Sequence, residues 1–170
     1  LKTDELFTLF QPGEKCSICY ALTTQNSILL NILDNIGNAI YEIQLKNGEW
    51  RSKLLPFKEK GMLNIIGPND CNSEYFIAFE NFLSPTILYL CGSNMKEPIK
   101  IKSLPVKFDA KDMEFKQKFS TSKDGTKIPY YLVSKKGLKI DGNNPVLLYG
   151  YGGFEHSMMP GYRPIVGKLW

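Results

Sequence analysis

The sequence is poor in several features that would assign it to a class at once. It contains a single histidine, His156, among 170 residues, and a Gly-x-Ser-x-Gly motif occurs nowhere in it. No uninterrupted apolar run approaches the ~18 residues of a membrane-spanning helix, and no basic segment followed by an apolar stretch resembles a signal peptide. A net charge of +4 is too small over this length to indicate nucleic-acid binding. The sequence therefore predicts neither a membrane nor a nucleic-acid partner.

What is present suits a packed protein. Apolar residues make up 43% of the sequence and aromatic residues 12%, which is more than a disordered chain carries. The sequence begins at Leu1 without a methionine and stops at Trp170 within an apolar stretch. We therefore expect the 170 residues to be a piece of a longer protein.

Four cysteines raise the question of a metal or redox site. Cys16 and Cys19 have zinc-knuckle or redox spacing, but Cys71 and Cys91 are too far apart to supply the second pair of a zinc site. The alternating residues around Cys16 predict a strand, whereas a redox pair begins a helix. We predict four reduced, packed thiols, which favours a reducing compartment and hence a cytoplasmic location. A periplasmic or secreted form stays open.

Residues 1–106 are predicted to be entirely β. Short segments with period-two alternation are separated by turn residues, and Asn47-Gly48 is a strong hairpin signal. The expected strands are 16–22, 27–33, 39–45, 49–55, 62–66, 74–80, 86–90 and 99–103. They form two meanders offset by about 45 residues, close to the spacing of propeller blades. No segment of this half has the apolar stripe of a helix.

The pattern changes after residue 106. Residues 107–114 are polar and charged and are the best linker candidate. Two strands, 115–121 and 127–134, flank Asp124-Gly125, and Pro129 restricts the second strand to an edge or a strand start. Lysines of this region alternate with acidic residues, which indicates a solvated hairpin face. Residues 145–150 are wholly apolar and predict a strand buried on both faces, as in a parallel α/β sheet.

A glycine-rich segment follows that predicted buried strand. Tyr149–Phe154 holds three glycines within four positions, which permits conformations and close approaches that a β-carbon forbids. It fits a phosphate-binding loop poorly, because the GxGxxG register and a following Lys-Ser/Thr are both absent. The open alternatives are a tight turn and a loop that supplies an oxyanion donor in an α/β-hydrolase. His156 is interpreted as a partly exposed loop histidine.

The order of these motifs resembles the prolyl oligopeptidase family of serine peptidases. The resemblance is carried by residues 122–129, 135–138 and 145–154, and the YGYGGF string at 149–154 is specific. Residues 82–85 with Leu88-Tyr89 resemble a propeller segment just before that family's catalytic domain. The match is colinear over nearly the whole sequence and strongest from 119 to 154.

The resemblance implies a mostly β chain: a partial β-propeller, followed by the first strands of an α/β-hydrolase domain. Residues 1–106 would be the C-terminal part of the propeller, 107–114 the crossing between domains, and 115–170 the start of the catalytic domain. Tyr151 matches the family tyrosine that donates to the oxyanion, and Phe154 matches an aromatic residue of the proline pocket. No metal or organic cofactor is implied.

The resemblance also implies a function for the parent protein: hydrolysis of short, proline-containing peptides on the carboxyl side of proline. The family's serine, acid and histidine would lie beyond Trp170, and His156 does not correspond to the catalytic histidine. We therefore expect this chain to be inactive alone, with the rest of the enzyme chain as its partner. Incomplete domains would expose strand edges, so we also expect aggregation or dependence on that partner.

Two alternatives stay open. One is a non-catalytic β-module, or remnant, that binds a protein partner through exposed strand edges. The other is a related oligopeptidase of different specificity, or an acylaminoacyl peptidase, which keeps the fold and changes the pocket.

Overall fold

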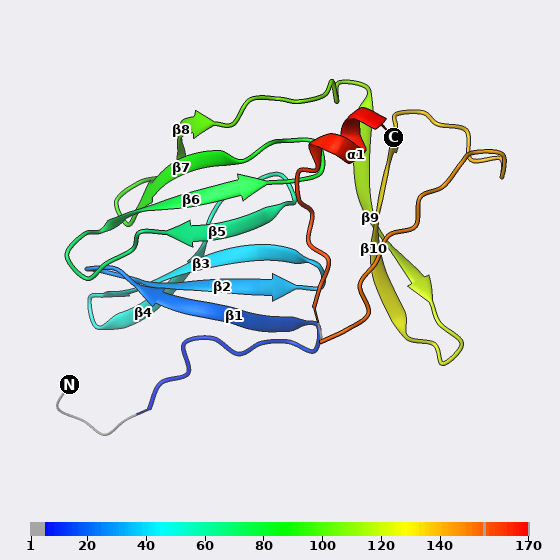
Figure 1. Cartoon of the computed structure of the whole chain (residues 1–170). Coiled ribbons are helices and arrows are strands. Elements are labelled where there is room, and N and C mark those ends of the chain that lie inside the picture. The colour runs from blue at the N-terminus through cyan, green and yellow to red at the C-terminus, as the bar shows by residue number, and fades with distance from the viewer. Residues whose placement is uncertain (1–5, 155, 170) are drawn as a thin grey trace.

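The computed structural model describes residues 6–154 and 156–169, in which two antiparallel sheets stand beside a β-hairpin (Figure 1). The first sheet has the order β1(Cys16–Thr23), β2(Ile28–Asp34), β3(Gly37–Lys46) and β4(Glu49–Leu54). The second has the order β5(Met62–Ile66), β6(Glu74–Glu80), β7(Ile87–Gly92) and β8(Ile99–Ser103). The hairpin is β9(Met113–Thr121) and β10(Lys127–Lys135), and α1(Pro164–Leu169) is a single short helix.

Both sheets are meanders, as the sequence predicts, because each strand pairs with the next along the chain. Asn47 and Gly48 join β3 to β4 with φ angles of 52° and 80°. Positive φ at both central residues is the signature of a type I′ turn, whose twist matches that of the flanking strands. The mostly β architecture is therefore confirmed, and in the described residues no helix precedes α1.

The two sheets share one hydrophobic core. Alternate residues of β2 and β3, such as Leu29 and Ile40, meet Tyr75, Ile77 and Phe79 of β6. The opposite face of the first sheet holds a smaller cluster, Leu30, Ile32 and Ile43, which the segment before β1 covers with Leu9 and Phe10. Period-two alternation thus determines which residues join each cluster.

Side chains of the first sheet satisfy the free backbone edge of β5. The Tyr20 hydroxyl accepts a hydrogen bond from the Ile65 amide at 3.1 Å, and the Asn31 amide donates to the Leu63 carbonyl at 2.8 Å. The Leu63 amide donates to the Asn38 side-chain oxygen at 3.3 Å. These bonds replace the ladder that an edge strand lacks, so they join the sheets without a shared strand pair.

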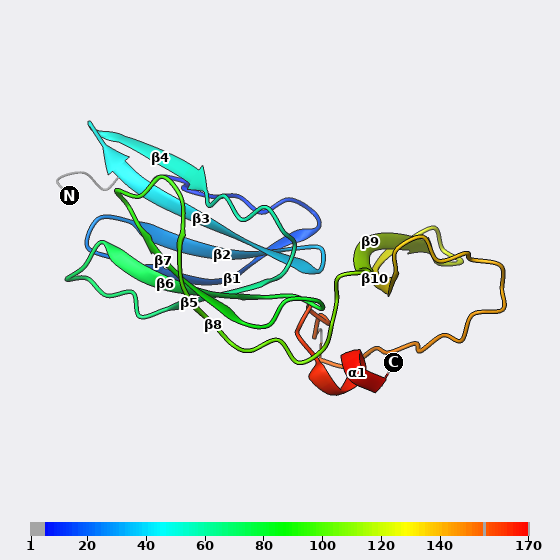
Figure 2. The same cartoon turned by 90° about the horizontal axis from the view of Figure 1, so that it is seen from above.

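The hairpin docks against the ends of both sheets, on the side of the β2–β3 and β6–β7 turns (Figure 2). The ring of Phe82, which follows β6, lies edge-on to Phe115 and Tyr131, with centroids 5.5 and 5.3 Å apart. The Tyr131 hydroxyl donates to the Ile36 carbonyl at 2.9 Å. Pro129 lies in β10, an edge strand, as predicted.

Residues 145–150 are not a strand, which corrects the sequence prediction. Val146 and Leu148 are 79% and 94% exposed, and the segment has no β-sheet partner among the described residues. A strand buried on both faces needs neighbouring strands and covering layers, and apolar composition alone supplies neither. Helix α1 was not anticipated from the sequence.

The predicted linker 107–114 contacts the C-terminal part of the chain. Phe108 stacks on Tyr162 with ring centroids 5.1 Å apart, and the Lys107 amide donates to the Tyr162 hydroxyl at 2.8 Å. Strand β9 already begins at Met113, so the last residues of the predicted linker belong to the hairpin. The division into domains stays a prediction.

The cysteines are unpaired, but the prediction that all four are packed is wrong. Cys91 is buried and Cys16 partly buried, whereas Cys19 and Cys71 are exposed. Cys19 lies at a bulge between Ile18 and Tyr20, where it has no partner on β2, and Cys71 lies in the β5–β6 loop. Within the described residues, no group of His, Cys, Asp and Glu side chains is arranged to hold a metal ion. The helix of the described part is too short to cross a membrane.

Candidate functional site

Tyr151 lies in the irregular segment that leads from β10 back toward the sheets (Figure 1). Its side chain is 52% exposed, and its ring lies edge-on to His156 with centroids 5.8 Å apart. The Arg163 guanidinium lies 4.5 Å from the centroid of the neighbouring Tyr149 ring, a cation–π contact. These are side-chain contacts within a segment that has no regular secondary structure before α1.

A tight turn places Tyr151 beside His156. The His156 amide donates to the Gly153 carbonyl at 3.1 Å, and a β-carbon at Gly153 would lie 3.4 Å from the Tyr151 ring. Gly150 and Gly152 have open space around them, and 3.4 Å is an ordinary van der Waals distance, so the structure shows no close approach that requires glycine at these three positions. The positive φ of the turn, 54°, belongs to Phe154 rather than to a glycine.

Phe154 is separate from this contact. Its side chain is 95% exposed, and neither of the two cavities described below includes it or Tyr151. In the part of the chain that the structure describes, Tyr151 contacts His156. Neither cavity includes Tyr151 or Phe154, the two residues that the family resemblance identifies. The roles of Tyr151 and Phe154 stay predictions.

Chemically, the segment offers a phenol donor and an imidazole. An oxyanion donor needs an exposed, positioned hydroxyl, and Tyr151 is half exposed and belongs to neither hydrophobic cluster. His156 contacts the Tyr151 ring, and the described contacts pair it with no serine or cysteine.

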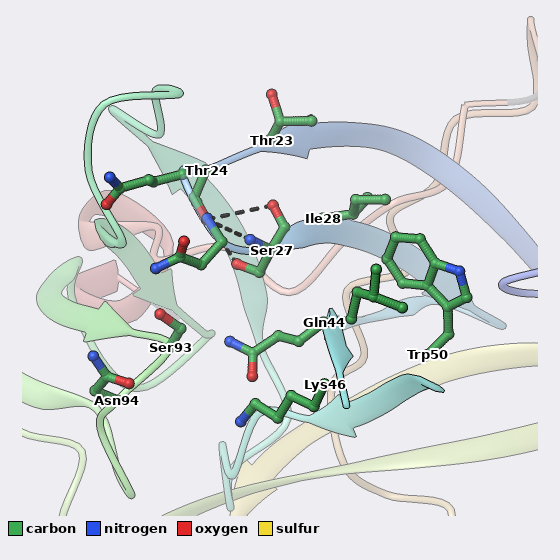
Figure 3. Close-up of a pocket in the computed structure, with 12 residues that line it drawn as sticks. Thr23, Thr24, Ser27, Ile28, Gln44, Lys46, Trp50, Ser93 and Asn94 are labelled. Atoms are coloured by element: carbon green, nitrogen blue, oxygen red, sulfur yellow. Dashed lines mark hydrogen bonds between the residues drawn. The ribbon is translucent and has the colours of Figure 1, made fainter. Parts of the chain in front are cut away.

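Two cavities of about 500 Å³ each lie elsewhere in the structure. The first, which we call the seam pocket, lies at the seam between the sheets (Figure 3). It is at the opposite end of the strands from the β2–β3 turn, which the hairpin contacts. It is lined by Thr23, Thr24, Gln25, Asn26, Ser27, Ile28, Gln44, Leu45, Lys46, Trp50, Ser93 and Asn94. The second lies where β9 meets the second sheet, and there the Lys60 ammonium donates to the Gln117 side-chain oxygen at 2.6 Å.

Sequence reasoning missed both cavities. The seam pocket combines the β1–β2 turn, the β3–β4 turn and the start of the β7–β8 connection, which no local motif links. Each of these turns carries polar residues that are ordinary in a loop. Only the packing of one sheet on the other brings them together, so no signal in the sequence marks them as a site.

A buried acid lies directly behind the seam pocket. Glu42 is 3% exposed and accepts a hydrogen bond from the Ser27 hydroxyl at 3.2 Å. Burial raises the pKa of its carboxyl, while the Ser27 hydrogen bond and Lys53 oppose the rise. The same interior raises the pKa of the Cys91 thiol to about 12 through burial, which makes that cysteine a poor nucleophile.

Comparison with known proteins gives a consistent set of relatives, although no family model matches the chain. An uncharacterized peptidase of Sinorhizobium fredii is 38% identical over 98% of this chain and 23% of its own length. A prolyl endopeptidase of Elizabethkingia miricola is 31% identical over 81% of this chain and 18% of its own length. A solved post-proline cleaving enzyme of Rickettsia typhi superposes with a TM-score of 0.78 and 32% identity, over 95% of this chain and 23% of that one. The chain thus spans less than a quarter of the length of each of these relatives.

Proposed function

Because the chain belongs to the prolyl oligopeptidase family of serine peptidases, we propose that it contributes part of an enzyme that hydrolyses short peptides on the carboxyl side of proline. The observation that carries this proposal is colinear similarity over 95% of the chain to a protein described as a post-proline cleaving enzyme. The specific aromatic–glycine string at 149–154 lies inside the matched region. We further propose a cytoplasmic location, in keeping with the unpaired thiols.

In this proposal the two sheets are adjacent blades of a propeller. Their meander topology and face-to-face packing suit that role. The hairpin and the segment 145–154 would open an α/β-hydrolase domain, and the exposed apolar residues of 145–150 would become a central strand once covered. The crossing between the domains would lie at 107–114.

Tyr151 is proposed as an oxyanion donor. When a serine attacks the scissile carbonyl, the tetrahedral intermediate carries a full negative charge on oxygen, and a prepositioned hydroxyl stabilises it. The hydroxyl of Tyr151 is available for this, because the side chain is half exposed and its ring is held from the side by His156. Phe154 is proposed as an aromatic wall for the substrate proline, a flat ring against a flat ring.

Replacement of the Tyr151 hydroxyl tests the proposed role. In the complete enzyme, Tyr151→Phe keeps the ring and removes the donor, so kcat for a proline chromogenic substrate should fall about a hundredfold. KM should change little, because the donor acts on charge that develops only in the transition state. Tyr149→Phe is the matched control, since its ring contacts Arg163 and its hydroxyl is given no role. A kcat within twofold of wild type would remove Tyr151 from the mechanism.

The 170-residue chain alone is predicted to have no peptidase activity. Its one histidine contacts Tyr151, and the sequence has no Gly-x-Ser-x-Gly motif in which a nucleophile could be held. The test is incubation of the purified chain with the same chromogenic substrate, with and without a serine-directed phosphonate. Turnover that the phosphonate abolishes would contradict the prediction.

A further inference from the structure

The seam pocket has the features of a built binding site rather than of a surface dimple. Hydrogen bonds fix the loops that form its walls: the Thr23 hydroxyl donates to Asp70 at 2.7 Å, and the Gln25 amide donates to the Asn72 carbonyl at 2.9 Å. On the other side, the Lys53 ammonium donates to the Met95 carbonyl at 3.3 Å. Each of these bonds joins the first sheet to the second, so the pocket keeps its shape as long as the sheets stay packed.

One buried polar group beside the pocket lacks a protein partner. Gln44 lines the pocket and is only 8% exposed. The Ser93 hydroxyl is buried and has no hydrogen-bond partner among the described residues. A buried polar group without a partner is costly, and groups of this kind mark places where a ligand or water completes the hydrogen bonding.

These groups converge on one side of β3. Alternation along the strand puts Glu42, Gln44 and Lys46 on the same face. The polar ends of Gln44 and Lys46 point toward the side on which Ser93 and Asn94 lie (Figure 3). Trp50 and Ile28 lie on the other side of the strand end in the same view. The part of the pocket that can make polar contacts with a ligand is therefore a cleft between β3 and the residues after β7.

The charges of this cleft favour an anion. Lys46 lines it, and Lys53 borders it through its bond to the Met95 carbonyl. On β4, Arg51 lies opposite Gln44, but Glu49 engages it at 3.3 Å. Glu49 lies opposite Lys46 across the β3–β4 pair, Asp70 accepts the Thr23 hydroxyl, and Glu42 lies behind Ser27 with its carboxyl already hydrogen-bonded. An ammonium and two side-chain amides that can donate are suited to carboxylate oxygens, and the same amides can also pair with a peptide main chain.

We propose that the seam pocket is a second peptide-binding site, in which Lys46 and Gln44 recognise the free carboxylate end of a short peptide. The carboxylate lies against the Lys46 ammonium and the Gln44 amide, and the preceding main chain lies against the exposed Asn94. A free small carboxylate shares this chemistry, and the choice of a peptide rests on the proposed function. The site lies on the opposite side of the sheets from the hairpin, far from the Tyr151 segment.

The experiment measures binding and leaves catalysis out. The complete protein is treated with a serine-directed phosphonate, and fluorescence anisotropy follows a short, proline-free peptide that carries an N-terminal fluorophore. We expect saturable binding of the free-acid peptide and at least tenfold weaker binding of the same peptide amidated at its C-terminus, since the charge-assisted bonds are lost. N-acetylglycine should compete poorly if the main chain contributes, whereas full competition would identify a small carboxylate as the ligand and overturn the peptide assignment.

Two variants test the residues. Lys46→Met should weaken binding of the free-acid peptide about tenfold and leave the amidated peptide unchanged. Gln44→Glu keeps the shape of the side chain but repels the carboxylate of the peptide, so it should also weaken binding. Lys100→Met, on the exposed strand β8, is the control and should have no effect on binding. Equal affinity for the two peptides, or wild-type binding by both pocket variants, would overturn the proposal. Hydrolysis of a proline substrate is assayed separately, so failure of the proposed function leaves the binding result intact.

Discussion

One hydroxyl group links parts of the chain that are 95 residues apart. The Tyr131 phenol on β10 donates to the Ile36 carbonyl in the β2–β3 turn at 2.9 Å, and its ring packs against Phe82. Burial raises the pKa of this phenol to about 12, because the ionised form would lose its hydration without gaining a cation. The contact therefore depends on the neutral phenol.

Removal of that hydroxyl should change how stability depends on pH. Tyr131→Phe should lower the free energy of unfolding by about 1 kcal/mol near pH 8, because the Ile36 carbonyl loses its donor. Between an unfolded-state pKa of about 10 and the folded-state pKa of about 12, only the unfolded Tyr131 ionises, so wild-type stability falls as pH rises through this range.

Urea unfolding of wild type and Tyr131→Phe at about pH 8 and about pH 11 provides the measurement. The difference between the two proteins should shrink at the higher pH. Tyr75 has a pKa that burial also raises, but it is present in both proteins and cancels. An equal difference at both pH values would show that Tyr131 does not titrate as described.

At the scale of elements, strand β5 depends on side chains from the other sheet. Asn31 is 1% exposed and satisfies three partners at once: it donates to the Tyr20 hydroxyl and the Leu63 carbonyl and accepts from Asn38. A buried amide with all of these bonds rigidifies its surroundings, and its removal leaves several groups unpaired.

Asn31→Ala should therefore lower the free energy of unfolding by about 2 kcal/mol. The loss should be local as well as global, so hydrogen exchange at the Leu63 and Ile65 amides should accelerate more than at β7, which pairs on both sides. Asn26→Ala, in the exposed β1–β2 turn, is the matched control. Unchanged exchange at Leu63 and Ile65 would show that the side-chain bonds do not hold this edge.

Elements were predictable from the sequence where local chemistry decides them. Asn47-Gly48 and the alternation on either side are enough to fix one hairpin, because only a primed turn matches the twist of its strands. The prediction of a strand at 145–150 was wrong, because an apolar run indicates that a segment is buried but not which elements cover it. The seam pocket was unpredictable for the same reason: its residues converge only through contacts between sheets.

At the scale of the whole molecule, one segment exposes four consecutive apolar residues. Residues Val146, Leu147, Leu148 and Tyr149 are 53–94% exposed, and Phe154 is 95% exposed nearby. Contiguous apolar patches on a protein surface mark contacts with something else, or association when that contact is missing. The two sheets bury part of their apolar residues against each other, although outer strands also expose some, such as Ile99 and Ile101 of β8 at 52% each.

The isolated chain should therefore self-associate, with sedimentation coefficients that rise with protein concentration. Val146→Lys combined with Leu148→Lys should reduce this association, because charged side chains oppose the burial of the segment against another copy. Ser120→Lys combined with Asn143→Lys is the control, because it adds the same charge at exposed polar sites. It separates an effect at segment 145–149 from general charge repulsion between copies of the chain. If the chain is a monomer at all concentrations and melts in one sharp transition, or if both double variants dissociate equally, segment 145–149 is not the surface that drives association.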